Sequence, residues 1–213
     1  MHRDIKPENI LIDTARKQLW IIDFGLASFY FPNKPQAAYV GTLYWRAPEL
    51  SIGYKYSNYS VDTWSTGCIL ASMVFKRYPF FYASTVEDHL VCIANILGTA
   101  SLDKFLSNHG IVIDKHLRNE LGKRKAMNLV TYVNDDNMRR ATYPARDLIE
   151  SLLVYDHNDR LSAKEAMEHI FFVKVWPEHV RQPTPKKLVN IARKMNRQQA
   201  LVRREPRRHC FLL

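Results

Sequence analysis

The chain opens with the stretch MHRDIKPEN, residues 1–9, in which Asp4, Lys6 and Asn9 are separated by two and three positions. Fourteen residues after Asn9 the sequence reads DFG, at residues 23–25, and APE follows at residues 47–49. Carboxylate, ammonium and amide side chains are thus concentrated in a short stretch, and two further motifs follow it in a fixed order.

A β-hairpin is predicted between the first two motifs. Residues 10–12 (ILI) and 19–22 (LWII) are apolar, and they flank the polar turn DTARK at residues 13–17. Because antiparallel pairing brings the start of the first strand beside the end of the second, we expect Asn9 and Asp23 to lie close together.

The remaining sequence predicts a mainly α-helical fold. The chain has 213 residues, of which 46% are hydrophobic, enough for one sizeable core. Residues 60–75 are apolar nearly all round, which predicts a helix buried on every side. Capping boxes at residues 84–87 and 162–165 predict two more helices, the first ending at Gly98, and Pro144 opens another.

The expected location is the cytoplasm or the nucleus. No apolar run approaches the ~20 residues needed to cross a bilayer, and no signal-peptide pattern stands at the N-terminus. Cys68, Cys92 and Cys210 are far apart and lack C-x-x-C spacing, so neither a zinc site nor a disulfide framework is indicated.

The chemistry of the first motifs suits phosphoryl transfer. Oxygen ligands on two neighbouring elements suit Mg²⁺, which binds through a few protein oxygens together with substrate phosphates. Positioning and charge neutralisation carry most of the catalysis in such a reaction, and a carboxylate can accept the proton of the attacking hydroxyl. The alternative is that these are ordinary turn residues, which requires three motifs to coincide by chance.

Residues 1 to about 175 resemble the large, C-terminal lobe of a eukaryotic protein kinase. The resemblance implies a lobe at residues 1–176, with a group-specific insert at 84–141, and a basic tail at 177–213. It implies ATP and Mg²⁺ as cofactors and proteins as substrates. The implied site comprises a catalytic Asp4, Lys6 beside the transferred phosphate, Leu11 beneath the adenine, and Asn9 and Asp23 as Mg²⁺ ligands.

The same resemblance implies supporting roles. His2 and Phe24 would stack in a hydrophobic column, Asp62 would brace the catalytic loop, and Glu49 would pair with Arg160. A lysine two residues after Asp4, together with a threonine after Gly41, resembles a Ser/Thr kinase more than a Tyr kinase. The remaining supporting positions are Arg3, Gly25, Thr42 and Arg46.

Within the kinases, the chain resembles the group of cyclin-dependent, mitogen-activated, glycogen synthase and casein kinase II enzymes, the CMGC group. YWRAPEL at residues 44–50 and the insert carry this likeness. The casein kinase II catalytic alpha subunit is the nearest match, through IDFGLASFY at 22–30, PFFY at 79–82, ILGT at 96–99 and YDHNDRL at 155–161.

The chain shows three departures from the patterns of this group. Phe24 stands where casein kinase II has Trp. Of the basic residues that favour acidic substrates Arg46 is kept, but Tyr39 and Leu43 stand at two others, so a preference for acidic substrates stays open. The Thr-x-Tyr switch of the mitogen-activated kinases is also absent, because AAY at residues 37–39 lacks its threonine, and phosphorylation of Tyr39 stays open.

The 213 residues contain no G-x-G-x-x-G-x-V run and no strand lysine in a V-A-I-K context. We expect a truncated gene model with little or no activity as an isolated chain, and an uncovered apolar face beside the helix at 60–75. The alternatives are a non-catalytic interaction module and another CMGC-group kinase. A casein kinase II regulatory beta-type subunit is an implied partner, although its docking surface would lie in the missing part.

The basic charge is concentrated in the tail. Between Lys186 and Arg208, nine Lys and Arg residues face Glu205 alone, which accounts for +8 of the formal charge of +10. The last four residues, CFLL, fit the pattern for prenylation at Cys210, with the polybasic stretch as a second membrane signal. A solvated tail, contact with an acidic membrane surface and contact with nucleic acid all stay open.

Overall fold

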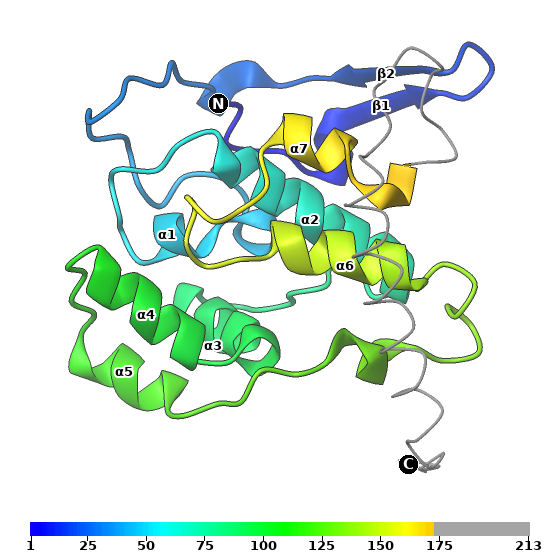
Figure 1. Cartoon of the computed structure of the whole chain (residues 1–213). Coiled ribbons are helices and arrows are strands. Elements are labelled where there is room, and N and C mark those ends of the chain that lie inside the picture. Colours follow the sequence, from blue (N-terminus) through cyan, green and yellow to red (C-terminus); the bar gives the residue numbers. More distant parts are fainter. Residues whose placement is uncertain (173–213) are drawn as a thin grey trace. The chain divides into compact units, whose positions relative to one another are not determined.

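The computed structural model describes residues 1–172, and it divides the chain into two compact units, Met1–Met167 and a second that begins at Glu168 (Figure 1). In the second unit the described part includes one 3₁₀ turn, η5 (Ile170–Phe172). The basic tail and Cys210 lie outside the described residues, so prenylation and the other fates of the tail stay predictions.

The predicted hairpin is confirmed. After a 3₁₀ turn, η1 (Pro7–Asn9), strand β1 (Ile10–Asp13) pairs antiparallel with β2 (Gln18–Ile21), with Leu11 opposite Trp20. Beyond the last pair, the Ile22 N–H donates to the Asn9 carbonyl at 3.0 Å. The first and second motifs therefore meet at one end of the hairpin, as expected from the sequence.

The rest of the first unit is mainly helical, as predicted, and the hairpin lies along one side of it (Figure 1). Three short 3₁₀ turns connect the elements: η2 (Phe24–Leu26), η3 (Leu43–Trp45) and η4 (Leu129–Tyr132). The helices are α1 (Pro48–Ser51), α2 (Ser60–Phe75), α3 (Val86–Leu97), α4 (Ala100–Asn108), α5 (Lys115–Leu121), α6 (Tyr143–Leu152) and α7 (Ala163–Met167). Within residues 1–172 no single helix is long and apolar enough to span a membrane, and only α3 and α4 together, bent by 115°, reach that length and composition.

The core is built around α2, which packs against α6 (Figure 1). A Cβ atom on Gly67 would lie 2.9 Å from the Leu152 Cβ, so the absence of a side chain there permits the close approach of the two helices. Trp64 on the same helix is fully buried and stacks on Phe81, with ring centroids 6.0 Å apart. This packing makes α2 the central element of the first unit.

The prediction that α2 is buried on every side is wrong. Met73 is 56% exposed, Thr66 is exposed, and Ile69 is only partly buried. These positions recur at spacings of three and four residues and so form one stripe along the helix. Within residues 1–172 no segment covers that stripe fully, which agrees with the expected uncovered apolar face.

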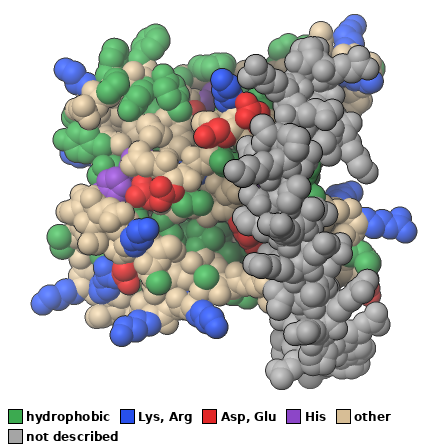
Figure 2. Space-filling view, in the orientation of Figure 1, with side chains coloured by type: hydrophobic (Ala, Val, Ile, Leu, Met, Phe, Trp, Pro, Cys, Tyr) green, Lys and Arg blue, Asp and Glu red, His purple; other side chains and the backbone are tan. Residues whose placement is uncertain are grey.

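Two other surfaces are also apolar. Both faces of the hairpin are open: Ile12 is 65% exposed and Trp20 is 46% exposed. Phe29 and Phe31 are exposed in the segment at 27–40 after η2, and Figure 2 shows hydrophobic side chains gathered at the upper left over this segment. A two-stranded sheet is marginal by itself in water, so its attachment to the helical body is what holds it in place.

The capping boxes differ in outcome. Helix α3 begins one residue later than predicted. Its N-cap is Thr85 and not Ser84, because the Thr85 hydroxyl accepts the Asp88 N–H at 3.0 Å. The helix ends before Gly98, as predicted. The box at 162–165 is confirmed, since Ser162 N–H donates to Glu165 Oε2 at 3.0 Å and Glu165 N–H donates to Ser162 Oγ at 3.3 Å.

A buried ion pair joins α1 to the loop before α7. Arg160 donates from Nη1 to Glu49 Oε1 at 2.9 Å and from Nη2 to Glu49 Oε2 at 3.1 Å, and both side chains are fully buried. Arg160 also donates to the backbone carbonyls of Ser60 and Val154, each at 2.8 Å. The guanidinium thus connects four segments of the chain.

Removing one partner of this pair should destabilise the fold strongly. Glu49→Gln leaves a buried guanidinium without its carboxylate, and we expect a loss of about 3 to 5 kcal/mol in the free energy of unfolding by urea denaturation. The exposed pair Arg118 and Asp103 is the control, because Asp103→Asn should cost less than about 1 kcal/mol. Equal effects from the two substitutions would contradict this account.

A second buried group makes stability depend on pH. Burial, aided by the nearby Arg46 guanidinium, lowers the pKa of His89 to about 4 from 6.5. The unfolded chain therefore binds a proton that the folded chain resists, so stability is lost as the pH falls from 6.5 towards 4.

We expect the wild-type chain to lose up to about 3 kcal/mol across this pH window through His89 alone. His89→Gln should flatten the pH dependence of the unfolding free energy, whereas His116→Gln, at an exposed position on α5, should leave it unchanged. Urea denaturation at several pH values measures both slopes. Parallel curves for wild type and His89→Gln would exclude His89 as the cause.

Candidate active site

A network of polar side chains surrounds Asp4. Its Oδ1 accepts hydrogen bonds from the Thr42 N–H and from the Thr42 hydroxyl, both at 2.8 Å. Its Oδ2 forms an ion pair with Lys6 Nζ at 2.8 Å and accepts from Asn9 Nδ2 at 3.3 Å. The first motif and the segment before η3, which are 38 residues apart, are therefore joined through one carboxylate.

The protonation state of Asp4 follows from these contacts. Burial alone would raise the pKa of the carboxyl, but the hydrogen bonds from Lys6 and Thr42 outweigh burial and lower the pKa below its usual value of 3.8. Asp4 is ionised at neutral pH and can act as a proton acceptor or as an orienting group for a hydroxyl. Lys6 also donates to Thr42 Oγ1 at 2.9 Å, which fixes its ammonium group beside the carboxylate.

Asn9 and Asp23 lie at the end of the hairpin. Asn9 is buried, and its amide nitrogen donates to the Asp4 carbonyl at 2.9 Å, so the amide oxygen faces away from that carbonyl. Asp23 has a left-handed backbone with φ of 62°, and its Oδ1 accepts the Gly25 N–H at 3.2 Å. Its side chain is exposed, so the carboxylate is accessible from solvent.

The backbone of His2 and Arg3 is held from α2. Asp62 accepts the His2 N–H at 2.8 Å and the Arg3 N–H at 2.7 Å. Arg3 has a positive φ of 68°, which is unfavourable for a residue with a side chain. Two hydrogen bonds to one carboxylate, together with the bond from Arg3 Nε to the Leu26 carbonyl at 2.7 Å, offset that cost.

His2 and Phe24 contact each other edge to face, with ring centroids 4.9 Å apart. His2 Nε2 also lies 3.0 Å from the Ile22 carbonyl. Phe24 is nevertheless 64% exposed, and Leu11, expected beneath the adenine, is 50% exposed on β1. The structure therefore brings these groups to the same end of the hairpin as Asn9 and Asp23 but leaves their outer surfaces open.

Gly41 is a site residue whose importance the motif pattern did not indicate. Its φ is +85°, and a Cβ atom there would lie 2.4 Å from the Arg3 carbonyl oxygen. Its own carbonyl accepts two hydrogen bonds from the Arg46 guanidinium, from Nε at 3.2 Å and from Nη2 at 2.6 Å. The signal in the sequence is a glycine directly before Thr42, but the contact with Arg3 is visible only in the fold.

The family is established by comparison with known proteins. The model of the protein kinase domain family matches residues 1–172. This match covers most of the chain, so the chain belongs to the protein kinase family.

The donor set at the hairpin fits the cofactors of this family, ATP and Mg²⁺. Asn9 and Asp23 supply amide and carboxylate oxygens, which are the ligands that Mg²⁺ prefers. Neither side chain is locked in an ion pair among the described residues. Asn9 and Asp23 would hold the Mg²⁺, and the chemistry that it would supply there is neutralisation of charge on the phosphates of ATP.

The close contact at Gly41 can be tested by substitution. Gly41→Ala combines a positive φ with a collision against the Arg3 carbonyl, and we expect it to lose about 2 to 3 kcal/mol of unfolding free energy. Gly110→Ala is a matched control, because Gly110 also has a positive φ but a Cβ atom there would meet nothing within 4 Å. Its expected cost is about 1 kcal/mol. Urea denaturation measures both, and a smaller loss for Gly41→Ala than for Gly110→Ala would refute the contact.

Proposed function

We propose that the chain is the catalytic lobe of a Ser/Thr protein kinase similar to the casein kinase II catalytic alpha subunit, which transfers the γ-phosphate of Mg-ATP to protein Ser or Thr hydroxyls. The network of Asp4, Lys6 and Thr42 is the observation that carries the proposal. It presents an ionised carboxylate and an ammonium group side by side, next to the oxygens of Asn9 and Asp23.

Each group has a chemical role in this proposal. The Asp4 carboxylate orients the substrate hydroxyl and accepts its proton as the new P–O bond forms and the bond to the ADP oxygen breaks. The Lys6 ammonium neutralises negative charge on the transferred phosphoryl group. Asn9 and Asp23 hold Mg²⁺, and Leu11 contributes an apolar surface beneath the adenine.

The preference for Ser and Thr rests on Lys6 and Thr42. Their direct hydrogen bond at 2.9 Å holds the ammonium beside Asp4, where it would meet the phosphoryl group as the hydroxyl attacks. We expect the selectivity for acidic substrates to be weaker than that of casein kinase II, because the Arg46 guanidinium already donates to the Gly41 carbonyl. Tyr39 is 61% exposed and so is accessible to a modifying enzyme.

The isolated chain is proposed to have little activity. Its 213 residues contain neither a glycine-rich loop nor a strand lysine of the kinase type, and these groups clamp the β- and γ-phosphates in the family. A non-catalytic interaction module is the second candidate function, and the exposed apolar residues of the hairpin and of α2 favour it.

Phosphotransfer from radiolabelled Mg-ATP to a Ser/Thr/Tyr peptide library tests the proposal. The 213-residue chain should be slow, and a version extended by the sequence encoded upstream should be faster. In the active form Asp4→Asn should reduce the rate about 10²- to 10⁴-fold, because the proton acceptor is lost. Phosphoamino-acid analysis should yield phosphoserine and phosphothreonine.

Asp13→Asn is the matched control, since Asp13 lies at the opposite end of the hairpin and pairs with Arg16. Asp13→Asn should leave the rate of phosphotransfer unchanged. Asp23→Ala should abolish both the activity and its dependence on Mg²⁺ concentration. Transfer to tyrosine alone would overturn the Ser/Thr assignment. Full activity of the 213-residue chain would overturn its proposed dependence on further sequence, and an upstream in-frame stop codon would favour the interaction module.

A further inference from the structure

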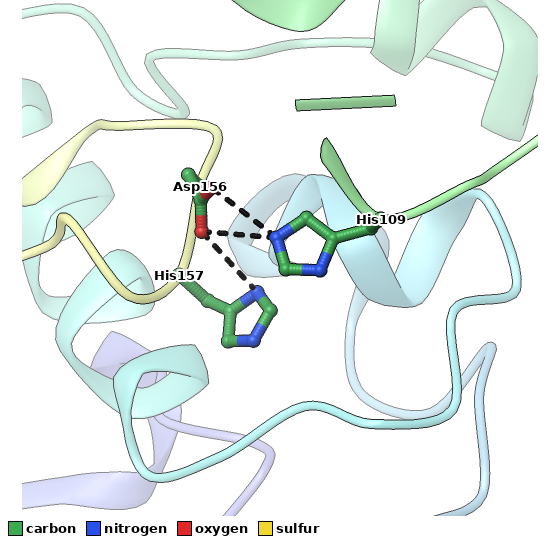
Figure 3. Close-up of side chains that lie close together, drawn as sticks. All are labelled: His109, Asp156 and His157. Atoms are coloured by element: carbon green, nitrogen blue, oxygen red, sulfur yellow. Dashed lines mark hydrogen bonds and ion pairs between the residues drawn. The ribbon is translucent and has the colours of Figure 1, made fainter. Parts of the chain in front are cut away.

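Three potential metal ligands meet away from the Asp4 network. His109 follows α4, and Asp156 and His157 lie in the loop between α6 and α7, 47 residues further along the chain (Figure 3). His109 Nε2 lies 3.2 Å from both oxygens of Asp156, and His157 Nδ1 lies 3.9 Å from Asp156 Oδ1. One ligand atom from each residue falls within 4.8 Å of the other two.

We propose that His109, Asp156 and His157 form a Zn²⁺ site. Two imidazole nitrogens and one carboxylate oxygen are a donor set typical of zinc sites that keep a fourth position for water or another ligand. Zinc–ligand bonds of about 2.0 to 2.2 Å need donor atoms about 3.4 Å apart in a tetrahedron. The separations of the two histidines from Asp156, 3.2 and 3.9 Å, bracket that value, and all three ligand atoms lie within 4.8 Å of one another, so side-chain rotations can bring them to tetrahedral spacing.

His157 provides independent support for a ligand. The residue is only 5% exposed, and its buried Nδ1 has no hydrogen-bond partner among the described residues. A buried ring nitrogen without a partner carries a desolvation cost that a bound ion would offset. Figure 3 shows His157 and His109 on two sides of the Asp156 carboxylate, so an ion bound there would satisfy that nitrogen.

The protonation states suit a cation. Burial lowers the pKa of His157, so its ring is neutral at pH 7. Burial opposes ionisation of Asp156, but the hydrogen bonds from the Asn158 N–H and from His109 outweigh it and lower the pKa of the carboxyl. Zinc binds neutral imidazole and ionised carboxylate, which are the states that His157 and Asp156 hold at pH 7.

Outer contacts hold the ligands in place. The Tyr54 hydroxyl lies 3.1 Å from His109 Nδ1 and can accept a hydrogen bond from it, and in that tautomer the Nε2 lone pair would bind the ion in place of the hydrogen bond to Asp156. The Asn158 N–H donates to Asp156 Oδ1 at 3.1 Å. Metal-binding histidines in proteins usually have such a partner on the second ring nitrogen.

A polar cavity of about 200 Å³ gives access to the cluster. Its walls include His109 and His157 together with Tyr30, Asn33 and Lys34 from the segment at 27–40. Solvent water in this cavity can therefore supply the fourth ligand. Bound Zn²⁺ would tie the end of α4 to the loop between α6 and α7, and would stabilise the first unit.

The test uses the full chain, first freed of metal with a chelator, and titrates it with ZnCl₂ by calorimetry. We expect one Zn²⁺ per chain and a rise in the thermal unfolding midpoint. His109→Gln and Asp156→Asn should each weaken binding by about tenfold or more. His116→Gln, at an exposed histidine on α5, should bind Zn²⁺ like the wild type.

Failure of the wild type to bind Zn²⁺, or unchanged affinity in both cluster variants, would overturn the proposal. Binding through the tail would appear as a thiolate charge-transfer band with Co²⁺ that is lost in Cys210→Ser, and this result would also overturn it. Should either variant unfold, the wild type still decides the question: Zn²⁺ should shift the ring ¹⁵N signals of two histidines in an NMR spectrum, and unshifted signals would refute the site. The outcome is independent of phosphotransfer.

Discussion

The carboxylate of Asp62 is the constraint on which the arrangement of the site depends. It projects from the first turn of α2 and accepts the N–H groups of His2 and Arg3, at 2.8 and 2.7 Å. Because α2 is packed in the centre of the first unit, these two bonds hold the segment of residues 1–9 against the core. A loop with a positive φ at Arg3 would otherwise relax towards a more favourable conformation, and Asp4 would move with it.

The same logic extends from the loop to the segment before η3. Gly41 accommodates the Arg3 carbonyl because it has no side chain, and this approach places the Thr42 N–H and hydroxyl on Asp4. Arg46 then holds the Gly41 carbonyl from the opposite side. The Asp4 carboxylate is thus positioned by backbone geometry on two segments, and its ionised state is a consequence of the donors that this geometry supplies.

Short sequence patterns predicted local features well, whereas contacts between distant segments, such as that of Glu49 with Arg160, were expected only through the family resemblance. The hairpin and the Ser162 capping box follow from patterns of a few residues, and both are present. The exposed stripe on α2 could not be read from composition, because a helix that is apolar all round has no preferred face until its neighbours are known. His109 and Asp156 escaped notice for a related reason: no short motif links residues 47 positions apart.

The loop between α6 and α7 shows how the core and the histidine cluster are connected. Arg160 near its end is buried against Glu49, and its guanidinium also binds the Val154 carbonyl near the start of the loop. The loop is thereby closed on itself around one side chain, and Asp156 and His157 lie within the closed part. Asp156 and His157 stand only a few residues before Arg160 in the sequence. A displacement of Asp156 would therefore also strain the hydrogen bonds of Arg160. The ligands of the cluster are therefore preorganised by a pair whose primary effect is on the stability of the fold.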